Sequence, residues 1–204
     1  MHDNNLVVLD GDGVLWNYDL AFQKTAEKVL QRQVRLESNV YLLNERYGLT
    51  RDEVSQVKHE LSKDFYNIPE LDHAHELVQG IQSRGYDIVL LTAVSESEAK
   101  QRAQRVKDLD WNFVDVIAVP HEHASVQKGR HIDRLRPYAF MDDNLKYLSH
   151  ANHCEHLVLL QLGYEDLGKV PSHVTVVYDP LDFLSVLDQG FHHSSYNDNH
   201  AMIM

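Results

Sequence analysis

The 204-residue sequence predicts an α/β fold, a Rossmann-like parallel sheet of order 3-2-1-4-5 with helices on both faces and an inserted small helical cap. Two observations predict it. Short apolar runs alternate with amphipathic stretches, as in right-handed crossovers that cover both faces of a parallel sheet. In addition, roughly 75 residues separate the first two apolar runs, far more than one crossover requires.

The first strand is expected at Leu6–Leu9, a short and partly β-branched run closed by Asp10-Gly11-Asp12-Gly13. Such runs, bounded by glycines, are typical of buried strands in parallel sheets. Similar runs predict further strands at 87–91, 113–119, 138–141, 156–162 and 174–178.

Amphipathic stretches between these runs predict the covering helices. One spans about 71–84 and ends at Gly85, and the next follows a capping box of Ser95 and Glu98 and ends near Leu109. Three further helices are expected at 130–136, at 145–152, and from Asp179-Pro180 to Gly190.

The long segment after the first strand contains three helical patterns, near 19–32, 36–47 and 50–65. They predict a helical cap inserted into the core. The expected division is a catalytic core of residues 1–16 and 68–190, a cap of residues 17–67, and a polar, flexible tail of residues 191–204.

Composition limits the partners. The net charge of −12, without a basic stripe, argues against binding a nucleic-acid backbone, which relies on Lys and Arg. An acidic protein that handles phosphate needs a bound cation or backbone donors to offset long-range repulsion.

The single cysteine, Cys154, excludes an intramolecular disulfide and is interpreted as a small buried hydrophobe. The polar start and the short first apolar run predict a cytoplasmic protein with no membrane partner; the oligomeric state is left open.

Polar residues follow several strands at their carboxyl ends, where open α/β sheets bind ligands. Asp10 and Asp12 follow the first strand, Thr92 the second, and Asp142 with Asp143 the fourth. Carboxylates brought together there would repel one another without a cation. Oxygen ligands without a supporting Cys or His pair suit Mg²⁺.

These segments resemble the motifs of the haloacid dehalogenase (HAD) superfamily, in the family's order, from residue 6 to about 148. The matching segments are Leu-Val-Val-Leu-Asp10-Gly-Asp12-Gly-Val-Leu, Ile-Val-Leu-Leu-Thr92 and Phe-Met-Asp142-Asp143-Asn, with Lys128 where the third-motif lysine is expected. Lys100 and Lys107 are alternatives for that lysine, and Thr92 could merely cap its strand.

The resemblance implies a Mg²⁺-dependent phosphatase that hydrolyses a small phosphorylated metabolite, a phosphomonoester, through an aspartyl-phosphate on Asp10. Asp12 would be the general acid and base. It further implies phosphate binding by Gly11, Thr92, Ala93 and Lys128, and metal binding by Asp10, Asp12 through its backbone carbonyl, Asp142 and Asp143.

Two other functions stay open: a phosphomutase acting on a sugar phosphate, and a phosphate-binding regulatory module without turnover. Dehalogenases of the superfamily lack the second aspartate of the first motif, so Asp12 favours phosphoryl chemistry. The phosphonate-cleaving branch needs a cap lysine, whereas Lys24, Lys28, Lys58 and Lys63 are interpreted as helix-surface charges. His121-Glu122-His123 is interpreted as a solvated loop, with pocket lining or metal binding as alternatives.

Overall fold

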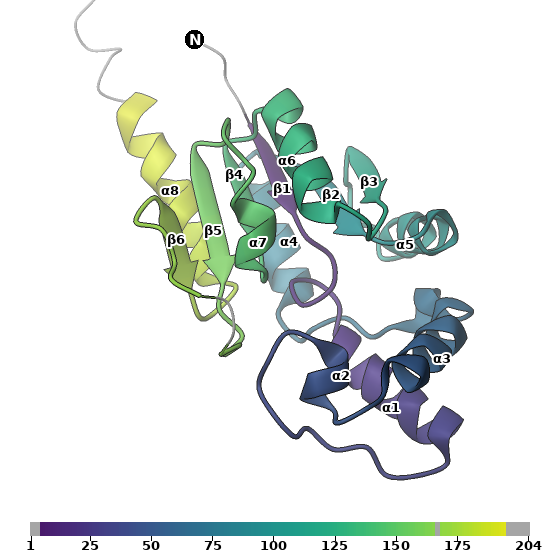
Figure 1. Ribbon diagram of the computed structural model, residues 1–204. Helices are drawn as coiled ribbons and strands as arrows, with labels where there is room; N and C mark the ends of the chain where they lie inside the picture. Colours follow the sequence, from purple (N-terminus) through teal and green to yellow (C-terminus); the bar gives the residue numbers. More distant parts are fainter. Residues whose placement is uncertain (1–4, 166–167, 195–204) are drawn as a thin grey trace, which may run out of the picture.

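The computed structural model describes residues 5–165 and 168–194 (Figure 1). Its sheet has the order β3-β2-β1-β4-β5-β6, and every neighbouring pair is parallel. The predicted fold and order are confirmed, and the last apolar run adds an edge strand beside β5. The strands are β1 (Leu6–Leu9), β2 (Asp87–Ala93), β3 (Asp115–Val119), β4 (Ala139–Asp142), β5 (His156–Leu160) and β6 (Val174–Val177).

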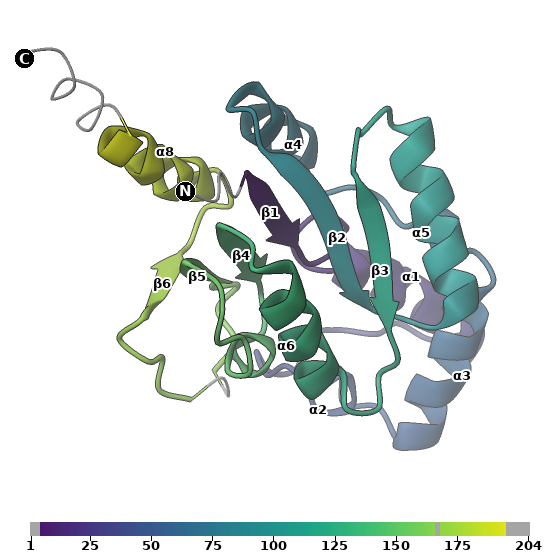
Figure 2. The same ribbon diagram turned by 90° about the horizontal axis from the view of Figure 1, so that it is seen from above.

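Helices cover both faces of the sheet (Figure 2). α4 (Ala74–Ser83) and α8 (Asp182–Ser194) lie on one face, and α6 (Ala124–Leu135) with α7 (Leu145–Leu148) on the other, while α5 (Glu96–Asp108) packs beside β3. Successive side chains of a strand point to opposite faces of the sheet, so each strand contributes to an apolar core on either face. Val7 and Leu9 join the cluster of α4 and α8, and Val8 joins that of α6 and α7.

The insertion lies beyond the carboxyl ends of the strands (Figure 1) and contains α1 (Tyr18–Leu30), α2 (Leu43–Arg46), α3 (Arg51–Ser62) and the 3₁₀-helix η1 (Phe65–Asn67). A capping box of Thr50 and Glu53 begins α3. α1 packs on α3, and Phe22 of α1 and Val57 of α3 belong to the same apolar cluster as buried residues of α4 and α8. The helices expected of a cap therefore lie where the cap was expected. The division into a core of residues 1–16 and 68–190 and a cap of residues 17–67 stays a prediction.

Two connectors join the helices α1 to α3 of the insertion to the sheet: the entry connector, residues 13–17, and the exit connector, residues 63–71, which includes η1. They run side by side. Asn17 N–H donates to the Pro69 carbonyl (2.8 Å) and Leu71 N–H to the Leu15 carbonyl (2.9 Å). Trp16 forms single β-bridges with Asp12 and Glu70. The insertion is therefore tied directly to the loop that follows β1.

Several predicted helix limits are wrong. Residues 36–42 are not helical, because the chain folds back so that the N–H groups of Glu37 and Ser38 donate to the Arg46 carbonyl. α6 begins at Ala124 rather than Arg130, with Gly129 inside it, and α7 ends at Leu148 rather than near residue 152.

α8 continues past Gly190 to Ser194, so residues 191–194 of the predicted tail are helical; residues 195–204 lie outside the described residues. Among the residues that the structure describes, no helix has the length and apolar character needed to cross a membrane.

Candidate active site

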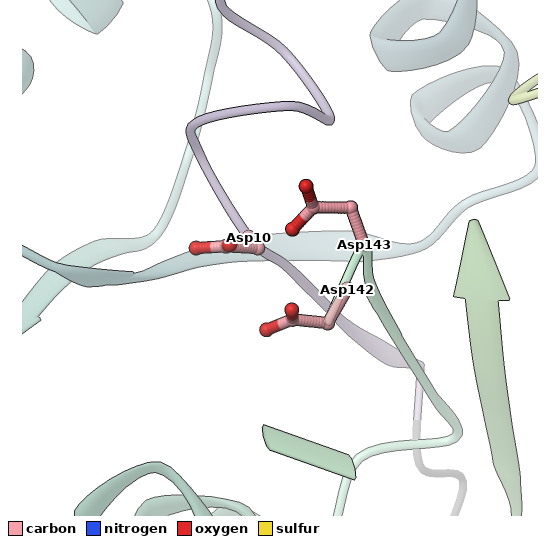
Figure 3. Close-up of side chains that lie close together, drawn as sticks. All are labelled: Asp10, Asp142 and Asp143. Carbon is pink, nitrogen blue, oxygen red and sulfur yellow. The ribbon is translucent and has the colours of Figure 1, made fainter. Parts of the chain in front are cut away.

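Three carboxylates meet at the carboxyl ends of β1 and β4 (Figure 3). Asp10 follows β1, and its N–H donates to the Met141 carbonyl of β4 (2.9 Å). Asp142 ends β4 and Asp143 is the next residue. One oxygen from each lies within 4.8 Å of the others, and all three residues are buried. The structure thus brings together three of the four expected metal ligands through their side chains.

Lys128 joins this group from α6. Its side chain is completely buried, with Nζ 2.7 Å from Asp142 Oδ2 in a hydrogen bond and 2.8 Å from Asp10 Oδ1 in an ion pair. The ammonium also lies 4.3 Å from the centre of the Tyr147 ring. Burial opposes its charge, but the Asp10 and Asp142 carboxylates outweigh burial and raise the pKa of Lys128, so it stays protonated.

One ammonium does not balance three buried carboxylates. Burial, followed by the charge of Asp10, raises the pKa of Asp142 to about 7. Burial, followed by the charge of Asp142, raises the pKa of Asp143 well above its usual range, and Tyr164 donates a hydrogen bond to Asp143 Oδ2 (3.3 Å). A hard divalent cation would relieve this repulsion, and an all-oxygen donor set fits Mg²⁺.

The Asp12 carboxylate lies apart from these three and pairs with Arg102. Its side chain is 25% exposed, whereas that of Arg102, on α5, is fully buried, and Arg102 Nη2 donates to Asp12 Oδ1. Burial raises the pKa of Asp12, and the Arg102 charge opposes that rise. Arg102 was not among the residues expected at the site. The available signal was its place one helical turn before Val106, the other buried residue of α5.

The loop after β1 is shaped by its glycines. The Gly11 carbonyl accepts hydrogen bonds from the N–H groups of Leu15 and Trp16 (2.8 and 3.1 Å). Gly13 has a φ of +84°, and a Cβ there would lie 2.5 Å from Asp143 Oδ2, so both backbone conformation and space demand glycine. A Cβ on Gly11 would lie 3.1 Å from Oγ1 of the buried Thr92. Thr92 therefore faces the loop that carries Asp10 and Asp12.

A cavity of about 670 Å³ opens above these residues. Asp10, Asp12, Thr92, Ala93 and Asp143 line it from the sheet side, and aromatic, aliphatic and polar side chains line it from the insertion, among them Tyr18, Tyr41, Val54 and Lys58.

Lys58 is the only one of the four cap lysines that lines this cavity. Its side chain is exposed, as expected of a helix-surface charge, but the cavity walls remove part of the water around its ammonium and so lower its pKa. Lys28 and Lys63 pair with Glu60, and Lys24 is exposed.

His121 also lines the cavity, whereas Glu122 and His123 do not. Within residues 5–165 and 168–194, the only carboxylate, His or Cys group suited to a metal is that of Asp10, Asp142 and Asp143.

A second buried arginine, Arg46 at the end of α2, links the insertion to the sheet. It pairs with Asp19 of α1, donates from Nε to the Val40 carbonyl (2.6 Å), and stacks 4.4 Å from the Tyr164 ring centre. Tyr164 in turn contacts Asp143. Neither residue was among those expected at the site, because the contacts of both depend on distant parts of the chain.

The structure resembles solved structures of the HAD superfamily, although no family model and no curated protein matches the sequence. A HAD family hydrolase from Deinococcus radiodurans R1, with bound phosphate and sodium, aligns with a TM-score of 0.64 and 10% identity over 92% of this chain and 96% of that one. A predicted phosphatase from Clostridium acetobutylicum aligns with a TM-score of 0.64 and 13% identity over 91% and 99%.

A dehalogenase with an intermediate complex has a TM-score of 0.61 and 14% identity over 91% and 98% of the two chains. At these identities the likeness is one of fold. This chain has the fold of these HAD-superfamily structures, which is the fold that the resemblance of its motifs implied.

Proposed function

We propose that this protein is a Mg²⁺-dependent phosphatase that hydrolyses a small phosphomonoester through an aspartyl-phosphate on Asp10. The observation that carries the proposal is the buried Lys128, which contacts both Asp10 and Asp142 at the base of a cavity lined by Asp12 and Thr92. A charged lysine is costly to bury unless it is paired. Here its position also suits contact with a phosphoryl group bound at Asp10.

In the proposed reaction an Asp10 carboxylate oxygen attacks phosphorus, and the bond from phosphorus to the leaving oxygen breaks. Asp12 donates a proton to that oxygen. Water then attacks the aspartyl-phosphate while Asp12 takes the water proton, which releases inorganic phosphate and restores Asp10. Splitting hydrolysis in this way lowers each barrier. General acid–base assistance contributes roughly 10²–10⁴-fold.

The surrounding residues would bind and orient the phosphoryl group. The Thr92 hydroxyl, the N–H groups of Gly11 and Ala93, and Lys128 are the proposed donors. Asp10, Asp142, Asp143 and the Asp12 backbone carbonyl would hold Mg²⁺, which neutralises charge on the phosphoryl oxygens when bound. The chain's net charge of −12 makes such compensation necessary.

The cavity favours an organic leaving group of small-metabolite size. Tyr18, Tyr41 and Val54 of the insertion offer aromatic and aliphatic surface, and the insertion covers the site on the side away from the sheet. A covered site excludes water and macromolecular substrates. Asp12 distinguishes the proposal from a dehalogenase reaction, which has no leaving oxygen to protonate.

Phosphate release from p-nitrophenyl phosphate and from a panel of sugar phosphates, nucleotides and small organic phosphates tests the proposal, with Mg²⁺ present. We expect Asp10→Asn to abolish turnover and Asp12→Asn to lower it by roughly 10²-fold or more with substrates of poor leaving group. Asp87→Asn is the matched control, because Asp87 is an exposed carboxylate at the amino end of the neighbouring strand. Near-normal activity of Asp10→Asn would refute the nucleophile assignment.

The same panel separates the other two functions. Isomerisation of a sugar phosphate without release of phosphate would assign a phosphomutase. Tight ligand binding with no turnover on any substrate would assign a binding module.

A further inference from the structure

Arg102 is an unusual arginine, because its side chain is completely buried and carries one ion pair, to Asp12. Its Nε and Nη1 atoms have no hydrogen-bond partner among the described residues. A buried charge with so few polar partners is costly. Two aromatic faces supply the compensation: the guanidinium carbon lies 4.1 Å from the Trp16 ring centre and 4.2 Å from that of Phe65. Both distances are within cation–π range.

The partners of Arg102 come from separate parts of the chain. Asp12 lies in the loop after β1, Trp16 in the entry connector and Phe65 in the exit connector. Arg102 itself is on α5, which also contacts the exit connector and the end of α3 through Gln101. The Gln101 Oε1 accepts from Tyr66 N–H (2.9 Å), and its Nε2 donates to the Ser62 carbonyl (3.0 Å). One guanidinium thus ties the Asp12 carboxylate to both connectors of the insertion.

We propose that Arg102 is the positioning residue of Asp12, holding this carboxylate in the orientation from which it serves the leaving oxygen, and that Trp16 and Phe65 hold Arg102. The inference rests on the proposed function, in which Asp12 is the acid and base. A planar guanidinium between two rings cannot rotate freely, so the direction of its N–H groups is fixed. Lysine at this position would keep the charge but would neither fill both ring contacts nor fix a donor direction.

A positioning role and a purely structural role differ in a measurable way. Proton donation matters most for a leaving group that is a strong base, and little for one that departs as a stable anion. Misplacing Asp12 therefore slows formation of the aspartyl-phosphate from phenyl phosphate far more than its formation from 2,4-dinitrophenyl phosphate. A fold that is merely weakened lowers both rates by the same factor, because only the amount of active enzyme changes.

The experiment compares kcat/KM of the full chain on these two aryl phosphates, with Mg²⁺ present, for the wild type, Arg102→Met, Arg102→Lys and Phe65→Leu. This ratio reports formation of the aspartyl-phosphate and leaves out its hydrolysis, in which Asp12 serves both esters equally. We expect Arg102→Met to lower kcat/KM about 30-fold with phenyl phosphate and less than about threefold with the dinitrophenyl ester. The larger loss is part of the roughly 10²–10⁴-fold that acid–base assistance contributes. Arg102→Lys and Phe65→Leu should show the same selectivity with smaller losses. These two variants keep the inference testable if Arg102→Met does not fold.

Arg105→Met is the matched control. It removes an arginine from the next turn of α5 that pairs with Glu70 (2.8 Å) but does not pair with Asp12, and both rates should stay near those of the wild type. Equal losses on both esters, or no loss in the foldable variants, would overturn the inference even if Asp10→Asn is inactive as proposed. Absence of phosphate release by the wild type, or an active Asp10→Asn, would instead refute the proposed function.

Discussion

Replacing Gly129 by alanine should damage both stability and catalysis, because this glycine is where α6 touches the chain after α7. An added Cβ would lie 2.4 Å from the His150 carbonyl oxygen and 2.8 Å from its carbonyl carbon. Ordinary contacts of a Cβ begin near 3.4 Å, so the two segments must separate by about 1 Å. Two of the three nearest atoms are backbone and the third is the His150 Cβ (2.6 Å), and none of them can rotate away as the end of a side chain does.

The expected magnitude is the difference between two effects. Forcing an extra carbon into a packed contact costs roughly 1–3 kcal/mol. Alanine in place of glycine within a helix returns about 1 kcal/mol. We therefore expect a net loss of up to about 2 kcal/mol in the free energy of unfolding. For a chain of this size the melting temperature falls by roughly 2–4 °C per kcal/mol.

Catalysis should suffer more, because Gly129 directly follows Lys128, whose ammonium contacts Asp10 and Asp142. A displacement of about 1 Å at a catalytic group can cost on the order of 10²-fold. Urea unfolding followed by circular dichroism, together with phosphate release on the folded variant, measures both effects.

Gly80→Ala is the control, since Gly80 is also inside a helix, α4, and its added Cβ would lie 2.6 Å from Leu184 Cδ1. That atom is the tip of a flexible side chain, so we expect unchanged or slightly higher stability and normal turnover. If Gly129→Ala matches Gly80→Ala in both measurements, the close approach of α6 to His150 is not a constraint on the site.

Two further predictions concern the metal and the cysteine. Chelation by EDTA should remove phosphatase activity and added Mg²⁺ should restore it, and Tyr164→Phe, which removes the hydrogen bond to Asp143, should raise the Mg²⁺ concentration for half activity by about tenfold; activity that survives exhaustive chelation would contradict the metal assignment. Burial raises the pKa of the Cys154 thiol to about 12, so at pH 8 only about 10⁻⁴ of it is the reactive thiolate, and iodoacetamide should label the native protein slowly, with a rate still rising above pH 10. Rapid labelling of the folded chain at pH 8, equal to that in guanidinium, would show that the thiol is accessible.

The sequence by itself determined the sheet and most of the proposed site, because both depend on local patterns. Apolar runs of four to seven residues specify buried strands. Once strands alternate with helices, right-handed crossovers place every carboxyl end on one edge. Asp10, Thr92 and Asp142 each follow such a run, so their convergence required no knowledge of side-chain packing. The glycines around Asp12 likewise indicate a tight loop from local backbone chemistry.

Only the tertiary structure decided which charged residues are buried and what they contact. Arg102 and Arg105 lie one turn apart on α5, yet only Arg102 faces Trp16, Phe65 and Asp12, residues from distant parts of the chain. The start of α6 was decided in the same way, because Gly129, a weak helix former, is kept within the helix where α6 packs closely on the chain after α7. The physical reason is that the free energy of a buried charge or a missing side chain depends on the surface packed across from it, and a local sequence window does not contain that surface.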